Sequence, residues 1–249
     1  MSRLMALVRA VNEKRVNFSQ GISRTRRRDG SAAALRLALL WVIEGTLRPA
    51  KNIRQRRFDR SLCIVTTGRI AVTDAMRSAA THPDSTRYES MSPQQIKTLL
   101  RRLPIDSPAH FTFLDLGSGK GLPLVLAASY GFPRVLGVEL DGGLVEMSRA
   151  NVRSFETRSP THAGVIGVTQ GDAANVVLPP GPTVLFLFNP FGEATLRIVV
   201  DNIERSLKVS PRPFFVAYYN PVHREVLDER PSLRRVLSTT RLAMYEAHG

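Results

Sequence analysis

The chain has 249 residues, with 35 Lys and Arg against 21 Asp and Glu, which gives a net charge of +14 at pH 7. Hydrophobic residues make up 43% of the sequence, a composition that excludes both a disordered chain and a membrane-embedded one. The single cysteine, Cys63, excludes an internal disulfide framework and a cysteine-based metal site, and it favours a reducing cytoplasm as the compartment.

Most of the positive charge lies in the N-terminal part of the chain. Residues 1–60 contain 15 basic and 4 acidic side chains, whereas residues 61–249 contain 20 and 17. We therefore expect a basic, partly helical extension over 1–90 and a main domain over 91–249. Such an arm can contact nucleic acid, an acidic protein or an anionic surface, and it can equally be a solvated tail. Its most apolar run, 32–43, is too short to span a membrane.

A capping-box pattern marks the start of one helix. Ser92 can cap a helix predicted over 93–102, and Gln95 stands at the position that completes the box. The basic extension is also expected to contain helices, one of them capped by Ser31. The helices expected there lie over 1–18, 31–47 and 72–80.

After Pro104 the sequence alternates short apolar runs, typical of strands, with longer segments typical of helices. This alternation predicts an α/β fold with a doubly wound, Rossmann-like sheet. A hairpin over 233–246 is expected to end the fold. The predicted strands cover 111–116, 135–140, 164–170, 184–188 and 214–219, and the predicted helices cover 121–130, 144–154, 193–207 and 222–229.

A glycine-rich loop follows the first predicted strand. Glycines at alternate positions let the backbone turn sharply and approach a ligand closely, and the next helix presents free amide groups there. Lys120 is followed by glycine rather than by Ser or Thr, which excludes a P-loop, and Leu122 stands where a dinucleotide fingerprint requires glycine. The residues expected to hold the ligand here are Asp115, Gly117, Ser118, Gly119 and Gly121.

Acidic residues follow three successive strands. Asp115 would repel a pyrophosphate and suits a ligand with an ammonium or sulfonium group. Glu139 ends the second strand, where a carboxylate can accept both ribose hydroxyls. Asp172 follows the third strand and can accept a hydrogen bond from an adenine amino group, while the Ala173 amide meets a ring nitrogen. Each acid alone is better explained as a helix cap or a surface turn, but the ordered set predicts a nucleoside site.

These residues resemble the class I S-adenosylmethionine-dependent methyltransferases. The segment 115–121 is similar to the first motif of that family, and Glu139 and Asp172 are similar to its ribose and adenine acids. The resemblance covers about residues 108–249 and implies S-adenosyl-L-methionine as the cofactor. It also implies a seven-stranded sheet with an antiparallel last strand, although the tail after Tyr219 leaves little room for two more strands. The five histidines show no metal-ligand spacing, so no metal is expected.

A closer resemblance is to a group of bacterial methyltransferases with four short motifs. The group is distantly similar to the non-SET histone-lysine methyltransferases, mainly through 115–119 of this chain. Cys63 and Val65 depart from the group, which has glycine and aspartate there. The motifs are F-D-R at 58–60, D-x-G-S-G-K-G at 115–121, F-N-P-F-G at 188–192 and Y-Y-N-P at 218–221.

The resemblance implies methyl transfer by in-line displacement at a sulfonium carbon. Asn189 and Pro190 follow the fourth strand, where Asn189 is expected to touch the cofactor. Its side chain or the exposed carbonyls of this segment can accept hydrogen bonds from an incoming amine. Phe191 can stack on adenine or on the substrate. The segment is similar to the N-P-P-[FY] motif of amino-group methylases, which favours a nitrogen nucleophile, but Phe191 and Gly192 stand where that motif has proline and an aromatic residue. Tyr219 is expected to face the site, and Tyr88 to cover the methionine end of the cofactor.

Three functions stay open at this point. The first is a methyltransferase that acts on a protein or another macromolecule with the help of the basic arm. The second is a methyltransferase of a small metabolite. The third is a catalytically silent module that binds the cofactor or a partner, and the intact acids and glycines count against it.

Overall fold

The computed structural model describes residues 58–62, 64–66 and 91–248, together with residues 23, 26, 31, 32, 35 and 39 of the N-terminal region. The chain divides into two compact units, Met1–Lys51 and Asn52–Gly249, and the sheet lies in the second unit. Of the helix expected over 31–47, residues 31, 32, 35 and 39 are helical. The helices expected over 1–18 and 72–80 lie outside the described residues.

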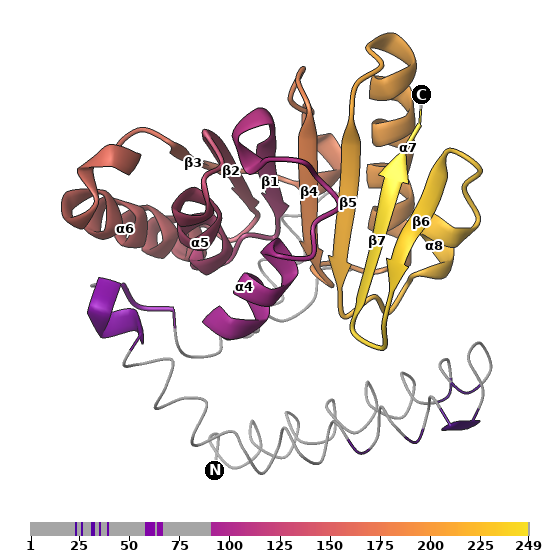
Figure 1. The fold of residues 1–249 in the computed structure, drawn as a ribbon, viewed down its shortest axis with the longest axis horizontal. Helices are drawn as coiled ribbons and strands as arrows, with labels where there is room; N and C mark the ends of the chain where they lie inside the picture. The colour runs from indigo at the N-terminus through magenta and orange to yellow at the C-terminus, as the bar shows by residue number, and fades with distance from the viewer. Residues whose placement is uncertain are drawn as a thin grey trace. The chain divides into compact units, whose positions relative to one another are not determined.

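Seven strands form one mixed sheet in the order β3-β2-β1-β4-β5-β7-β6 (Figure 1). The first five are parallel, and β7 runs antiparallel to both β5 and β6. This arrangement confirms the predicted doubly wound α/β fold. The strands are β1 (Thr112–Leu116), β2 (Arg134–Glu139), β3 (Ile166–Gln170), β4 (Thr183–Phe188), β5 (Phe214–Tyr219), β6 (Leu233–Ser238) and β7 (Leu242–Ala247).

The sheet has the seven strands that the resemblance implies, and the last two form after Tyr219 although the tail is short. Two short connections leave enough residues for these strands. The helix between β5 and β6 is the single turn α8 (Glu225–Asp228), and residues 239–241 suffice to join β6 to β7. The two strands form the hairpin that the sequence predicts over 233–246.

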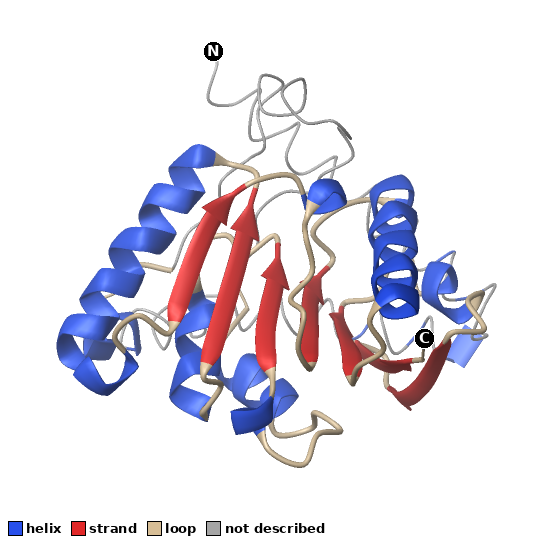
Figure 2. Ribbon diagram, turned by 90° about the horizontal axis from the view of Figure 1, so that it is seen from above, coloured by secondary structure: helices blue, strands red, loops and turns tan. Residues whose placement is uncertain are grey.

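Helices cover both faces of the sheet (Figures 1 and 2). Residues of α4 (Pro93–Leu100), α5 (Leu122–Tyr130) and α6 (Gly142–Arg158) pack in one hydrophobic cluster. Those of α7 (Glu193–Val209) and α8 pack in the other. Because both faces are covered, β4 is buried almost along its whole length, as its continuous apolar run predicts. Short 3₁₀ helices lie at Pro108–His110, Pro160–His162 and Ala173–Asn175.

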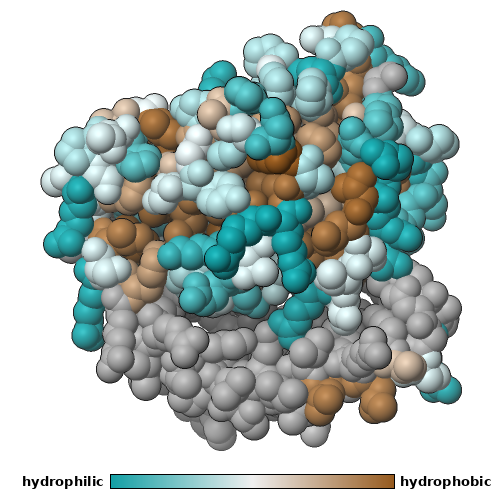
Figure 3. Space-filling view, viewed as in Figure 1, coloured by the Kyte–Doolittle hydropathy of each residue, from teal (hydrophilic) through white to brown (hydrophobic). Residues whose placement is uncertain are grey.

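Two helix ends follow their sequence signals. Ser92 and Gln95 form the predicted capping box at the start of α4, and Gly131 ends α5 in the left-handed conformation at φ 109°. On the surface that Figure 3 shows, hydrophobic residues lie in separate patches among hydrophilic ones. No helix within the described part of the chain is long and apolar enough to cross a membrane.

Candidate functional site

The glycine loop turns sharply at the carboxyl end of β1. Gly117, Gly119 and Gly121 have φ angles of 83°, 54° and 80°, in the region that favours glycine. A Cβ atom on Gly117 would lie 2.5 Å from Cβ of Pro190, so only a glycine lets the loop approach the segment after β4 this closely. The structure therefore brings together two of the predicted motifs, which are far apart in the sequence.

Glu139 ties the glycine loop to the end of β2. Its Oε2 accepts a hydrogen bond from the amide of Gly119 at 2.8 Å, and its Oε1 accepts one from the amide of Asp141 at 3.0 Å. Burial raises the pKa of this carboxyl, whereas the two amide bonds act to lower it. A carboxylate offers about four acceptor sites, so capacity for further donors is left.

Asp115 is a buried carboxylate beside Glu139. It is 1% exposed, and its Oδ2 has no hydrogen-bond partner among the residues that the structure describes. Burial, and then the charge of Glu139, raise its pKa well above the usual value of 3.8. An unpaired buried carboxylate is costly, so the position calls for a ligand that donates hydrogen bonds or carries positive charge.

Asp172 follows β3 at the same edge of the sheet. Its Oδ1 accepts from the amide of Ala174 at 2.9 Å and caps the 3₁₀ helix that begins at Ala173. Its Oδ2 is buried, again without a partner within the described region. Asp172 therefore has the helix-capping role expected of a single acid, and its Oδ2 remains available to a ligand.

A polar chain links the ends of β4 and β5. Asn189 has a positive φ of 44°, and its Oδ1 accepts a hydrogen bond from the hydroxyl of Tyr218 at 3.1 Å. The same hydroxyl oxygen accepts from the amide of His223 at 3.4 Å. The ring of Phe191 is 5% exposed and packs in the cluster with α7, so its surroundings are those of a core residue rather than of a stacking platform.

The two tyrosines at the end of β5 lie on opposite faces of the sheet, as strand alternation requires. Tyr218 is fully buried on the side of α7. Tyr219 is partly exposed on the side of α4, where its hydroxyl oxygen accepts from Nε2 of Gln95 at 2.9 Å and its ring packs edge-on against Phe188. Tyr88, expected to cover the cofactor, lies outside the described residues.

The contacts of residues 58–62 and 64–66 beside the glycine loop are not apparent from the sequence. The carboxylate of Asp59 accepts from the amide and the hydroxyl of Thr66, at 2.9 and 2.7 Å. Asn151 of α6 exchanges hydrogen bonds with the backbone of Val65 and also donates to the carbonyl of Lys120 at 2.9 Å. Lys120 itself is 6% exposed, and burial lowers its pKa while Asp59 acts to raise it.

Residues 64–66 are therefore linked to the glycine loop through the side chain of Asn151. The available signal was the F-D-R motif at 58–60, which contains Asp59. Nothing in the spacing of the motif connects it to Asn151, because that contact is formed by tertiary packing.

No protein-family model and no curated protein matches the sequence. Among solved structures, the chain is similar to a candidate RNA methyltransferase from Pyrococcus horikoshii, with a TM-score of 0.51 and 14% identity over 78% of this chain and 100% of that one. An RNA methyltransferase from Salinibacter ruber, in complex with S-adenosyl-L-homocysteine, gives a TM-score of 0.45 and 16% identity over 64% and 93% of the two chains. A candidate S-adenosylmethionine-dependent methyltransferase from Methanococcus maripaludis gives 0.46 and 15% over 63% and 84%. The first likeness supports the Rossmann-like methyltransferase fold.

Proposed function

We propose that this protein is a class I S-adenosyl-L-methionine-dependent methyltransferase. The observation that carries the proposal is the buried carboxylate of Asp115, whose Oδ2 lacks a partner within the described region, beside a loop of left-handed glycines. Glu139 and Asp172 follow the next two strands, so three acids line adjacent strand ends. Rossmann-like sheets bind their ligands at such edges.

The three carboxylates and the Ala173 amide fit the separate groups of the proposed cofactor. Asp115 suits a cationic ammonium or sulfonium group, Glu139 the ribose hydroxyls, and Asp172 with the Ala173 amide the adenine ring. The bound cofactor would supply an electrophilic methyl group with a neutral thioether as its leaving group. The chain's own task is then to hold the acceptor in line and to exclude water.

We propose a nitrogen nucleophile on a protein or another macromolecule as the methyl acceptor. Asn189, held by Tyr218, offers oxygen acceptors to an amine, and its N-P-F-G segment packs against the glycine loop through Pro190. The net charge of +14 supports an acidic partner for the basic arm. We place the methyltransferase domain at 91–249, the arm at 1–90 and the protein in the cytoplasm.

The experiment is transfer of a radiolabelled methyl group from S-adenosylmethionine into a host lysate that lacks this protein. Enzyme-dependent label is expected in one fraction, and sensitivity to protease, to nuclease or to solvent extraction identifies the acceptor as protein, nucleic acid or small molecule. Label that is soluble in solvent would favour the small-metabolite function. No label, together with demonstrated cofactor binding, would favour the silent module.

Glu139→Ala and Glu156→Ala form a matched pair that tests cofactor binding by titration with S-adenosylhomocysteine. Both carboxylates accept a backbone amide, but Glu156 bonds to Gly164 in the exposed turn before β3. Loss of a charged acceptor costs roughly 1.5–3 kcal/mol, so Glu139→Ala should weaken binding of S-adenosylhomocysteine about 10- to 150-fold. Glu156→Ala should leave it unchanged. Equal affinities in the two variants would show that Glu139 does not contribute to the cofactor site.

A further inference from the structure

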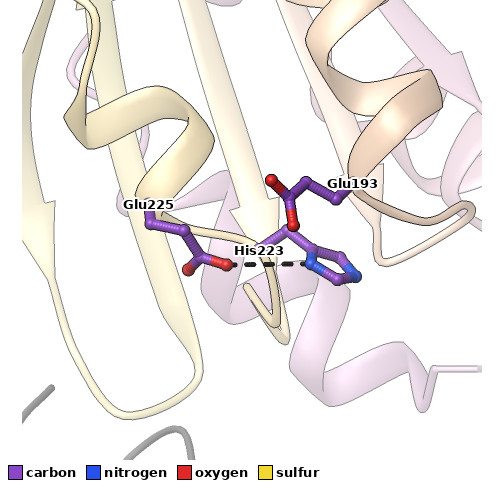
Figure 4. A group of neighbouring side chains, drawn as sticks. All are labelled: Glu193, His223 and Glu225. Atoms are coloured by element: carbon purple, nitrogen blue, oxygen red, sulfur yellow. Dashed lines mark ion pairs between the residues drawn. The ribbon is translucent and has the colours of Figure 1, made fainter. Parts of the chain in front are cut away.

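A second group of side chains with ligand atoms gathers at the ends of β4 and β5. Glu193 begins α7, Glu225 begins α8, and His223 lies in the loop between β5 and α8. Their ligand atoms all lie within 4.8 Å of one another. Figure 4 shows the two carboxylates approaching the imidazole from different elements. Because β4 and β5 are parallel neighbours, this group lies at the same edge of the sheet as the glycine loop.

The spacing of His223 and Glu225 suits a shared metal ion. Nδ1 of His223 lies 3.7 Å from Oε1 of Glu225, which is too long for a hydrogen bond. Two ligand atoms that are each 2.0–2.2 Å from one ion, at an angle of 110–120°, lie roughly 3.3–3.8 Å apart. The pair therefore has the separation expected of two ligands on one ion.

Surrounding contacts position two of the three residues, His223 and Glu193. The backbone of His223 donates to the Tyr218 hydroxyl at 3.4 Å, and the imidazole-bearing side chain is 12% exposed. Arg197 donates to Oε1 of Glu193 at 2.9 Å and also pairs with Glu229 at 3.2 Å, which shares its positive charge. Ligating carboxylates are commonly oriented by such outer partners, and a carboxylate has acceptor capacity for an arginine and an ion together.

We propose that His223, Glu193 and Glu225 bind one divalent transition-metal ion of the zinc class. An imidazole together with carboxylates favours zinc, cobalt or manganese over magnesium and calcium, which prefer oxygen ligands alone. Three protein ligands leave at least one coordination position open, as in catalytic rather than structural zinc sites. An ion there would bind the hydroxyl or amine of a methyl acceptor, a role that rests on the proposed function, whereas metal binding itself does not.

The test is titration of the full-length protein, dialysed against a chelator at pH 7.5, with Co²⁺ and then with competing Zn²⁺. The visible absorption of bound Co²⁺ and calorimetry with Zn²⁺ should both give one equivalent. His223→Ala and Glu225→Gln should each weaken binding more than about tenfold, since even outer-shell losses at metal sites cost 10- to 100-fold. The matched control is His110→Ala, because His110 forms an exposed pair with Asp106 at 3.1 Å.

Each outcome decides the proposal. Tight binding that depends on His223 and Glu225 but not on His110 supports it. No binding, binding that all three variants retain, or binding lost only in His110→Ala overturns it. Glu225→Gln keeps the shape of the side chain, so it tests the metal site even where His223→Ala fails to fold. An unchanged unfolding temperature without metal would show that both variants are folded. Binding of S-adenosylhomocysteine by His223→Ala separates failure of the metal site from failure of the proposed function.

Discussion

Replacement of Asp115 by asparagine should stabilise the ligand-free protein and weaken cofactor binding at the same time. The carboxylate is 1% exposed, lies beside Glu139 and has an Oδ2 without a partner among the described residues. Asparagine keeps a polar atom at this position but removes the negative charge, whose burial is the costly part. Removal of that charge should be worth about 1–3 kcal/mol, and each kcal/mol raises Tm by roughly 2–4 °C in a chain of this size. Loss of a charged partner for a cationic ligand should cost about 1.5–3 kcal/mol of binding.

The stability gain should depend on pH. The pKa of Asp115 is raised in the folded protein above its usual value of 3.8, so the folded state holds a proton that the unfolded state releases. The contribution of Asp115 to stability therefore falls as pH rises from about this usual value through the raised pKa. Asp115→Asn removes this loss, so its advantage over the wild type should be small near pH 3.8 and largest above the raised pKa.

Thermal unfolding across this pH range and calorimetry with S-adenosylhomocysteine measure the two effects. The control is Asp201→Asn, since Asp201 forms an ion pair with Arg230 and its loss should be neutral or destabilising by up to about 1 kcal/mol. A variant of Asp115 that is less stable than the wild type at neutral pH, or that binds the ligand as tightly, would refute the reasoning.

Two further substitutions test how the glycine loop is held. Gly117→Ala should lower stability and cofactor affinity more than Gly164→Ala, because both positions have positive φ but only the first Cβ would clash, with Pro190 at 2.5 Å; equal losses would contradict the contact. Asn151→Ala should destabilise the protein by roughly 1–3 kcal/mol and weaken binding of S-adenosylhomocysteine, because a buried loop carbonyl loses its donor; an unchanged unfolding temperature in a thermal scan would contradict that role.

Much of the fold follows from patterns that are local in the sequence. The continuous apolar run of β4 predicts a strand buried on both faces, and the Ser92 capping box and Gly131 mark helix ends that the structure confirms. The glycine loop is also a local signal, since alternate glycines at positive φ need no distant partner. Such features depend on the conformational preferences of the backbone, which the sequence expresses directly.

Features that depend on tertiary packing could not be predicted. Phe191 is apolar and follows a strand, which suits both a stacking surface and a core position. Its burial among residues of α7 depends on the tertiary structure. The bonds from Asn151 to residues 65 and 120 join distant segments. His223 lies close to two glutamates because β4 and β5 end side by side, although Glu193 is far from it in the sequence.

The most direct test of the central claim is calorimetric titration of the full-length wild-type protein with S-adenosylhomocysteine, with S-adenosylmethionine as competitor. The account predicts saturable binding of one ligand per chain, which S-adenosylmethionine displaces and NAD does not, because Asp115 and the interrupted glycine pattern disfavour a pyrophosphate. Absence of binding by both sulfur nucleosides, or tight binding of NAD at the same loop, would contradict it.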